Sequence, residues 1–102
     1  MLPWTAIAVA GPSMEPTTVS GDWWIVRRTQ RVRPRQLIAF RHPLRPSLIV
    51  VKRAIRPVDG GWWVEGDNAG FSDDSRTFGP VPTACVIGRL VWRYRRGGAP
   101  SN

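Results

Sequence analysis

Proline and glycine interrupt this chain too often for long helices. Ten prolines and ten glycines among 102 residues divide the sequence into short pieces. Proline removes a backbone donor and glycine loses the most conformational freedom on folding, so both weaken helix interiors. No window of useful length keeps apolar residues at the i, i+3, i+4, i+7 spacing of a buried helix face. The sequence therefore predicts short strands joined by turns.

Five runs carry the β-branched and aromatic residues that are typical of strands. They are residues 23–28, 37–41, 48–55, 62–65 and 85–95. Turn-forming residues separate them, including Gly21-Asp22, Arg33-Pro34, His42-Pro43, Pro46 and the segment 57–61. We predict a mostly β fold, a single compact antiparallel β domain over residues 1–96. At most one helical turn is expected, at residues 14–18, and residues 97–102 are expected to be a flexible tail.

Apolar residues make up 42% of the chain and charged residues 22%, which indicates a globular domain. The net charge of +8 raises the possibility of a nucleic-acid partner. The arginines are scattered, however, and no helix-turn-helix, zinc-finger or ribonucleoprotein motif is present. We therefore predict no nucleic-acid partner. A basic nucleic-acid-binding β domain stays as a distant alternative, and its stacking platform would be Trp23, Trp24, Trp62 and Trp63.

The apolar stretch at residues 2–10 is too short to cross a bilayer and lacks a basic flank. We predict no transmembrane helix and a soluble, cytoplasmic protein, with peripheral membrane contact through Trp and Arg residues left open. Cys85 and His42, each the only residue of its type, cannot supply a disulfide or a structural zinc site. No metal or cofactor is expected. His42, between Arg41 and Pro43, is interpreted as a surface loop residue.

The chain contains a single lysine among 15 basic residues, and it lies in the most apolar run. Strand alternation places Lys52 on one face with Leu48, Val50 and Ala54. Burial lowers the pKa of an amine, whereas a guanidinium stays charged, so only a lysine here can act as a general base. The alternative is a strand lysine whose ammonium reaches water. Position alone does not decide between them.

The segment 11–17 places Ser13 in a bend between Pro12 and Pro16, where Gly11 permits another chain to approach closely. A serine hydroxyl becomes a nucleophile when a base removes its proton, and serine–lysine dyads are one way to do this. The alternative is a serine that only caps a turn.

Four segments together resemble the type I signal peptidases, which are serine–lysine endopeptidases. The matching segments are Ser13-Met14-Glu15-Pro16-Thr17, Gly21-Asp22-Trp23-Trp24-Ile25-Val26, Val51-Lys52-Arg53, and residues 66–76, which match Gly-Asp-Asn-x-x-x-Ser-x-Asp-Ser-Arg. They occur in the family's order and with its internal spacing. Within the family, the sequence is most similar to a short branch of nickel-type superoxide dismutase maturation proteases. The resemblance implies a signal peptidase/LexA-like catalytic core.

The resemblance also implies the roles of individual residues. Ser13 is the nucleophile and its backbone N–H an oxyanion donor, Lys52 is the general base, and Ser72 orients the base amine. Asp74 and Arg76 form a structural pair, Asp67 shapes a turn, Arg53 gives structural support, and Met14, Ala10 and Val50 bind substrate. Some members carry a second oxyanion-hole serine where this chain has Gly11, so the second donor is left open.

The implied reaction is removal of an N-terminal leader or propeptide from a precursor protein. The substrate is expected to lie extended beside residues 8–10 and 49–51 as an added strand. The branch resemblance implies a nickel superoxide dismutase precursor as the substrate. The alternative is a general signal peptidase that acts on exported preproteins. The oligomeric state stays open.

Overall fold

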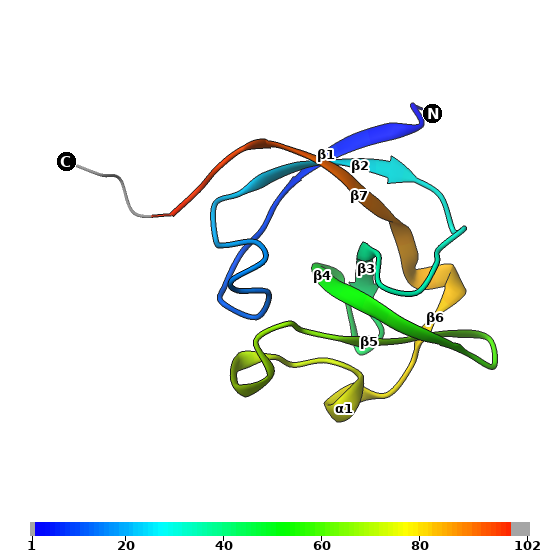
Figure 1. The fold of residues 1–102 in the computed structure, drawn as a ribbon. Helices are drawn as coiled ribbons and strands as arrows, with labels where there is room; N and C mark the ends of the chain where they lie inside the picture. The colour runs from blue at the N-terminus through cyan, green and yellow to red at the C-terminus, as the bar shows by residue number, and fades with distance from the viewer. Residues whose placement is uncertain (1, 99–102) are drawn as a thin grey trace.

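The computed structural model describes residues 2–98, which form one antiparallel sheet of seven strands. The strands are β1 (Trp4–Ala8), β2 (Trp23–Arg28), β3 (Leu37–His42), β4 (Arg45–Val58), β5 (Gly61–Glu65), β6 (Val81–Pro82) and β7 (Val86–Arg95). Their spatial order is β1-β2-β7-β3-β4-β5-β6 (Figure 1). Besides two single 3-10 turns, the only helix of the described part is α1 (Ser75–Phe78). The mostly β, antiparallel prediction is confirmed.

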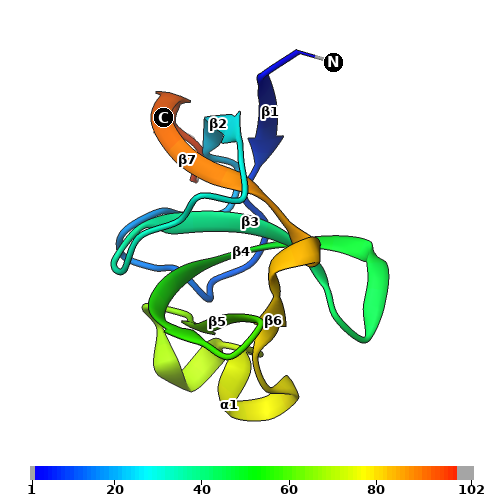
Figure 2. The ribbon, with the colours of Figure 1, turned by 90° about the vertical axis from the view of Figure 1, so that its right-hand side faces the viewer.

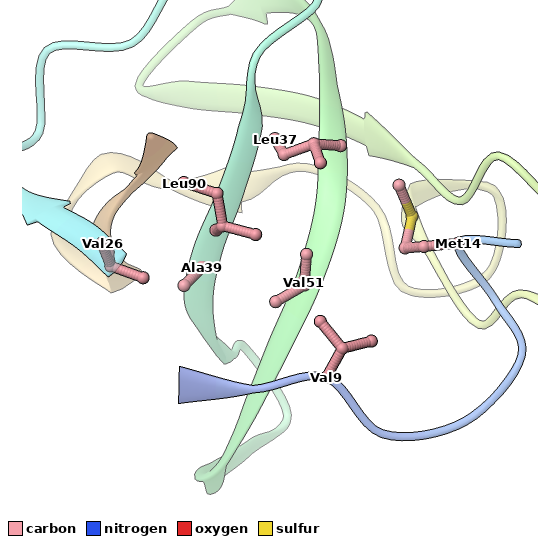
Figure 3. Packing of buried hydrophobic residues seen from close by; sticks show 7 residues of the cluster. All are labelled: Val9, Met14, Val26, Leu37, Ala39, Val51 and Leu90. Carbon is pink, nitrogen blue, oxygen red and sulfur yellow. The ribbon is translucent and has the colours of Figure 1, made fainter. Parts of the chain in front are cut away.

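The central strand β3 is buried on both faces, because the sheet folds around it. Figure 2 shows β1, β2 and β7 on one side of β3 and β5 and β6 on the other. Leu37 and Ala39 belong to one apolar cluster, whereas Ile38 and Phe40 belong to the other. Figure 3 shows the first cluster, Val9, Met14, Val26, Leu37, Ala39, Val51 and Leu90. An unbroken apolar run is typical of a strand that is covered on both sides.

The five predicted runs coincide closely with β2, β3, β4, β5 and β7, but β4 is longer than predicted. It continues through Pro46 and Pro57, which we had interpreted as turn residues. Among residues 45–50 of β4, Arg45, Ile49 and Val50 pair with β3, and Pro46 lies in the irregular part of that ladder with no partner in either neighbouring strand. Residues 56–58 pair only with β5. Each of these prolines therefore has an unpaired side where a missing N–H costs little. Strands β1 and β6 were not among the five predicted runs.

The predicted helical turn at residues 14–18 is a hydrogen-bonded turn, in which the N–H of Thr18 donates to the carbonyl of Met14 at 3.1 Å. In the predicted tail, Gly97 N–H donates to Asp22 Oδ1 at 2.7 Å and Gly98 N–H to the Ser20 carbonyl at 3.1 Å. Residues 99–102 of that tail lie outside the described residues. No helix within residues 2–98 is both long and apolar enough to cross a bilayer.

The four tryptophans of the nucleic-acid alternative do not form one exposed platform. Trp62 is buried in the second apolar cluster. Trp24 is partly buried and donates from Nε1 to Thr18 Oγ1 at 3.0 Å, and Trp63 donates to Glu65 at 2.9 Å. Stacking of successive bases needs exposed ring faces in a row. The arrangement therefore gives this alternative no support.

Candidate active site

Lys52 and Ser13 are in direct contact. The Nζ atom of Lys52 donates a hydrogen bond to Ser13 Oγ at 2.7 Å. Lys52 is only 5% exposed. In the β3–β4 register it lies opposite Ile38, next to the second apolar cluster that contains Ala54. Burial lowers the pKa of the Lys52 amine, while the carboxylates of Asp74 and Asp73 act in the opposite direction. The lowered pKa favours the neutral amine that a general base requires.

The segment that carries Ser13 is a tight corner held by its own hydrogen bonds. Gly11 has a φ of 81°, a conformation that L side chains rarely adopt. Nothing lies within 4 Å of the position that a Cβ on Gly11 would take. Gly11 therefore supplies left-handed backbone and not the close approach of another segment of this chain. Three residues after Gly11, Met14 is 1% exposed and anchors the corner in the first apolar cluster.

The loop at residues 66–74 packs directly against this corner. The N–H of Asn68 donates to the Ser13 carbonyl at 2.8 Å, and its side-chain amide donates to the Pro12 carbonyl at 3.0 Å. A Cβ on Gly66 would lie 2.1 Å from Ser72 Oγ and 2.7 Å from the Ser13 carbonyl oxygen. Glycine at position 66 is therefore required for the loop to pack this closely against Ser13.

Asp74 is the centre of the hydrogen bonds within that loop. Its carboxylate is fully buried and accepts from Ser72 Oγ at 2.6 Å, from the Gly66 N–H at 2.8 Å and from the Arg76 guanidinium at 2.6 Å. Burial alone would raise the pKa of Asp74. These hydrogen bonds outweigh it and hold the pKa well below the usual range. Asp74, which is buried, thus pairs with the exposed Arg76 as the resemblance implies, and we propose that this pair supports the loop.

Ser72 lies beside the dyad, but its hydroxyl donates to Asp74. In the part of the chain that the structure describes, Lys52 Nζ forms one hydrogen bond, to Ser13, and none to Ser72. The base-orienting role of Ser72 is therefore a proposal that rests on the resemblance and on its place in the loop.

Arg53 and Asp67 connect the base strand to the same loop. Arg53 Nε and Nη2 donate to the two carboxylate oxygens of Asp67 at 2.8 and 2.7 Å. Thr17 Oγ1 donates to Asp67 Oδ2 at 2.5 Å. The carboxylate of Asp67 therefore links the β4 strand that carries Lys52 to the corner after Ser13 and to the loop.

These residues open into a groove of about 440 Å³ between two sheet edges. Residues 6–10 line one side, residues 48–52 line the other, and Ser13 and Met14 lie between them. The predicted substrate-binding residues Met14, Ala10 and Val50 all line this groove. The arrangement brings a serine hydroxyl, a buried amine and two strand edges to one place.

Comparison with known proteins identifies the family to which the chain belongs. The sequence matches the Peptidase S24-like family over residues 3–91. The chain is a member of this family. It is 31% identical over 111 residues to mitochondrial inner membrane protease subunit 1 of Xenopus tropicalis, covering 85% of this chain and 66% of that protein. It is 32% identical over 122 residues to subunit 2 of Saccharomyces cerevisiae, covering 88% and 69%.

An Arabidopsis thaliana relative, mitochondrial ATP-independent inner membrane protease subunit 1b, is 32% identical over 110 residues, or 81% of this chain. This Peptidase S24-like chain spans about two thirds of the length of these relatives. The predicted peptidase class is therefore confirmed at the level of the family. The relatives carry the names of membrane protease subunits and not of superoxide dismutase maturation proteases.

The prediction of a cytoplasmic location is wrong. The relatives of this Peptidase S24-like chain are named as subunits of an inner membrane protease. Our prediction rested only on the lack of a membrane-spanning segment in these residues, and such a lack does not determine where a protein acts.

The interpretation of His42 as a surface loop residue is also wrong. It is the last residue of β3 and only 5% exposed. Its ring packs against the ring of Phe78, with 4.6 Å between the two ring centroids. Its Nε2 lies 3.2 Å from Asp73 Oδ2, and both residues line the groove. Sequence reasoning missed Asp73 altogether. The one signal for it is its position between Ser72 and Asp74, where the matching motif has no fixed residue.

Proposed function

We propose that this protein is a serine endopeptidase in which Ser13 is the nucleophile and Lys52 the general base. The observation that carries the proposal is the 2.7 Å contact between the Lys52 amine and the Ser13 hydroxyl oxygen. The burial of the amine supports it, because a dry amine gives up its proton at a lower pH than a solvated one. Membership of a peptidase family supports it independently.

The reaction follows from the positions of these groups. The neutral Lys52 amine accepts the Ser13 hydroxyl proton as Oγ bonds to the scissile carbonyl carbon. The resulting ammonium donates that proton to the leaving nitrogen as the C–N bond breaks, which leaves an ester on Ser13. Lys52 then takes a proton from water, the water oxygen attacks the ester, and the proton returns to Ser13 Oγ.

The oxyanion of each tetrahedral intermediate needs a donor at the corner. We assign the Ser13 backbone N–H to this task. Gly11 has no hydroxyl to offer, and its side of the corner is open. A second donor at position 11 is therefore limited to the backbone N–H of Gly11.

The groove suits a substrate that binds as an extended strand. Val9 uses its N–H and carbonyl on residues 21–22, so the alternation of antiparallel ladders directs the main-chain groups of Ala8 and Ala10 toward the groove. On the other side of the groove, the main-chain groups of Ala54 hydrogen-bond to residues 35 and 36, which precede β3. Because alternate residues of a strand direct these groups to the same side, those of Ile49 and Val51 point away from β3 and are free to bind a peptide. A peptide between the two edges can hydrogen-bond to both.

The proposed substrate is a precursor protein that loses an N-terminal leader. The nickel superoxide dismutase precursor implied by the sequence resemblance is one candidate, and an exported preprotein is the other. Each is tested by incubating the precursor with the purified protein and sequencing the new N-terminus. Release of a mature chain by wild type and not by the Ser13→Ala variant supports the assignment, and an intact precursor excludes it as the substrate.

We further propose that the protein works at a membrane surface, as the names of its relatives suggest. Trp4, Trp92 and Tyr94 are between 43% and 65% exposed, and Arg27 stacks on Trp4 with its guanidinium carbon 5.0 Å from the ring centroid. Exposed aromatic and basic residues favour the lipid interface. Co-sedimentation with anionic phospholipid vesicles tests this, and protein that stays in the supernatant contradicts it.

The dyad is tested with a fluorogenic peptide library and two variants. Ser13→Ala and Lys52→Arg should each reduce cleavage by at least about 1000-fold, because removal of a nucleophile or its base eliminates the main pathway. The matched control is Ser20→Ala, whose side chain lies outside the groove. Circular dichroism shows whether each variant is folded. Near wild-type cleavage by folded Lys52→Arg would overturn the role of Lys52, since arginine cannot deprotonate.

A further inference from the structure

The groove contains one carboxylate that the cleavage reaction does not use. Asp73 lines the groove together with Ser13 and Lys52, and its side chain is 61% exposed. Within residues 2–98 it is the only acidic residue that lines this groove. The rest of the lining is apolar apart from Ser13, Lys52 and His42. A solvent-facing carboxylate among apolar groups is a potential recognition element for a positive charge.

His42 fixes this carboxylate in place. The backbone N–H of Leu44 donates to His42 Nδ1 at 3.1 Å, so Nδ1 carries no proton and acts as an acceptor. In this hydrogen-bonding arrangement the ring proton is on Nε2, which donates to Asp73 Oδ2 at 3.2 Å. Asp73 Oδ1 accepts no hydrogen bond from the described residues. One oxygen is therefore held and the other is open to the groove.

The charge of Asp73 is not neutralised by a cationic partner within the described part of the chain. The neighbouring Asp74 has the guanidinium of Arg76 at 2.6 Å, whereas the only ion-pair partner of Asp73 is His42. An unpaired carboxylate beside the base favours the protonated form of Lys52, which opposes catalysis. A positive charge placed on Asp73 by the substrate removes this opposition. A cationic substrate therefore gains in binding and also assists the base.

We propose that Asp73, oriented by His42, is a specificity residue that selects substrates with a lysine or arginine side chain close to the scissile bond. The inference rests on the proposed function, because it assumes that peptides bind in this groove. The ammonium or guanidinium donates to Asp73 Oδ1, a charge-assisted hydrogen bond in a partly desolvated site. The rest of the groove accepts apolar side chains.

The test uses matched peptides that differ in one charge. A cleavable parent peptide carries lysine or acetyl-lysine, in turn, at each of about three positions on either side of the scissile bond. At one position or a neighbouring pair, wild type should cleave the lysine peptide with a kcat/KM about 10-fold higher, the size of one charge-assisted contact. At a pH above the acidic limb of the wild-type profile, where a lower Lys52 pKa no longer changes the rate, Asp73→Asn should abolish this preference by slowing only the lysine peptide. Asp59→Asn, a change at an exposed turn, should preserve it.

The outcomes distinguish recognition of a cationic side chain by Asp73 from a role of Asp73 in stabilising the loop. If Asp73→Asn slows both peptides equally, Asp73 only stabilises the loop and the proposal is overturned. Equal cleavage of both peptides by wild type at every position overturns it as well. Binding of the same peptides to Ser13→Ala tests recognition without cleavage and is followed by intrinsic tryptophan fluorescence, to which Trp23 in the groove contributes. A lysine preference in binding with no cleavage by wild type supports the role of Asp73 and contradicts the peptidase function. Equal or no binding contradicts the role of Asp73.

Discussion

Arg53 holds Asp67 through both carboxylate oxygens, and Asp67 also accepts a hydrogen bond from Thr17. Arg53 follows the proposed base Lys52 in sequence, and Thr17 follows the proposed nucleophile Ser13 by four residues. The pair therefore connects the strand that carries Lys52 to the corner that carries Ser13. Both groups are mostly shielded, with 28% and 19% of their side chains exposed. A bidentate pair of a guanidinium and a carboxylate fixes both the distance between the two side chains and their relative orientation.

Asp67→Asn should lower the free energy of unfolding by about 1–2 kcal/mol, because it removes the charge from a two-bond pair. Urea denaturation at pH 7 measures this loss. Asp59→Asn, an exposed acid outside the pair, should change stability by less than about 0.5 kcal/mol. Arg53 depresses the pKa of Asp67, so the contribution of the pair is present above the unfolded pKa and is lost as the pH falls below it. Equal effects of the two substitutions on the free energy of unfolding would show that the Arg53–Asp67 pair does not stabilise the fold.

Gly66→Ala should disrupt the site while Gly70→Ala leaves it intact. A Cβ at position 66 would overlap Ser72 Oγ at 2.1 Å, whereas at position 70 nothing lies within 4 Å. The loop must move away from Ser13 to accept the methyl group, so we expect kcat/KM to fall at least about 100-fold. Peptide cleavage by the two purified variants provides the comparison. Similar activity of both would show that the close packing of the loop on Ser13 is not needed for catalysis.

The rate should rise with pH through the pKa of Lys52. Only the neutral amine accepts the Ser13 proton, so kcat/KM increases as the pH passes the folded pKa, which burial places below the ordinary lysine value. Asp73→Asn removes one group that raises this pKa. It should therefore shift the acidic limb of the profile to lower pH with an uncharged substrate. A limb that stays in place, or moves to higher pH, contradicts the influence of Asp73 on the base.

Asp22 should contribute to stability at neutral pH and lose that contribution in acid. Burial opposes its ionisation, but hydrogen bonds from the Gly97 N–H, Thr18 and the Val19 N–H prevail and lower the pKa of Asp22 to about 2. Since the unfolded value is near 3.9, ionised Asp22 contributes about 2 kcal/mol above that pH, and the contribution disappears as the pH falls toward 2. Urea unfolding of wild type and Asp22→Asn at pH 6 and pH 2.5 measures this. The variant should show a smaller loss between the two pH values, and an identical loss rules the effect out.

The strands of the sheet were predictable where β-branched and aromatic residues were dense. The Trp23–Arg28 strand agrees with its prediction to the residue. Strand β1 was not among the predicted runs, although Trp4, Thr5 and Ile7 favour strands, because we considered the apolar residues 2–10 only as a possible membrane segment. The two-residue strand β6 is too short for any periodicity to appear.

The contacts of the site were less accessible from the sequence. The isolation of Lys52 among arginines marked it as unusual, but nothing in its strand pattern indicated that Ser13 lies against it; that expectation came from the motif resemblance. The burial of His42 depends on Phe78 and on the Leu44 N–H. These contacts form only when the end of β3 meets the segment after residue 72, and propensities of neighbouring residues do not describe them.

The unpaired edges of β1 and β4 present main-chain donors and acceptors, which bind an extended peptide without regard to its side chains. Any extended segment of suitable width competes for them, including the newly released product and the leading residues of another copy. The turnover rate is consequently expected to depend on how quickly the product leaves the groove after each cleavage. Concentrated enzyme is expected to inhibit itself by occlusion, which dilution relieves.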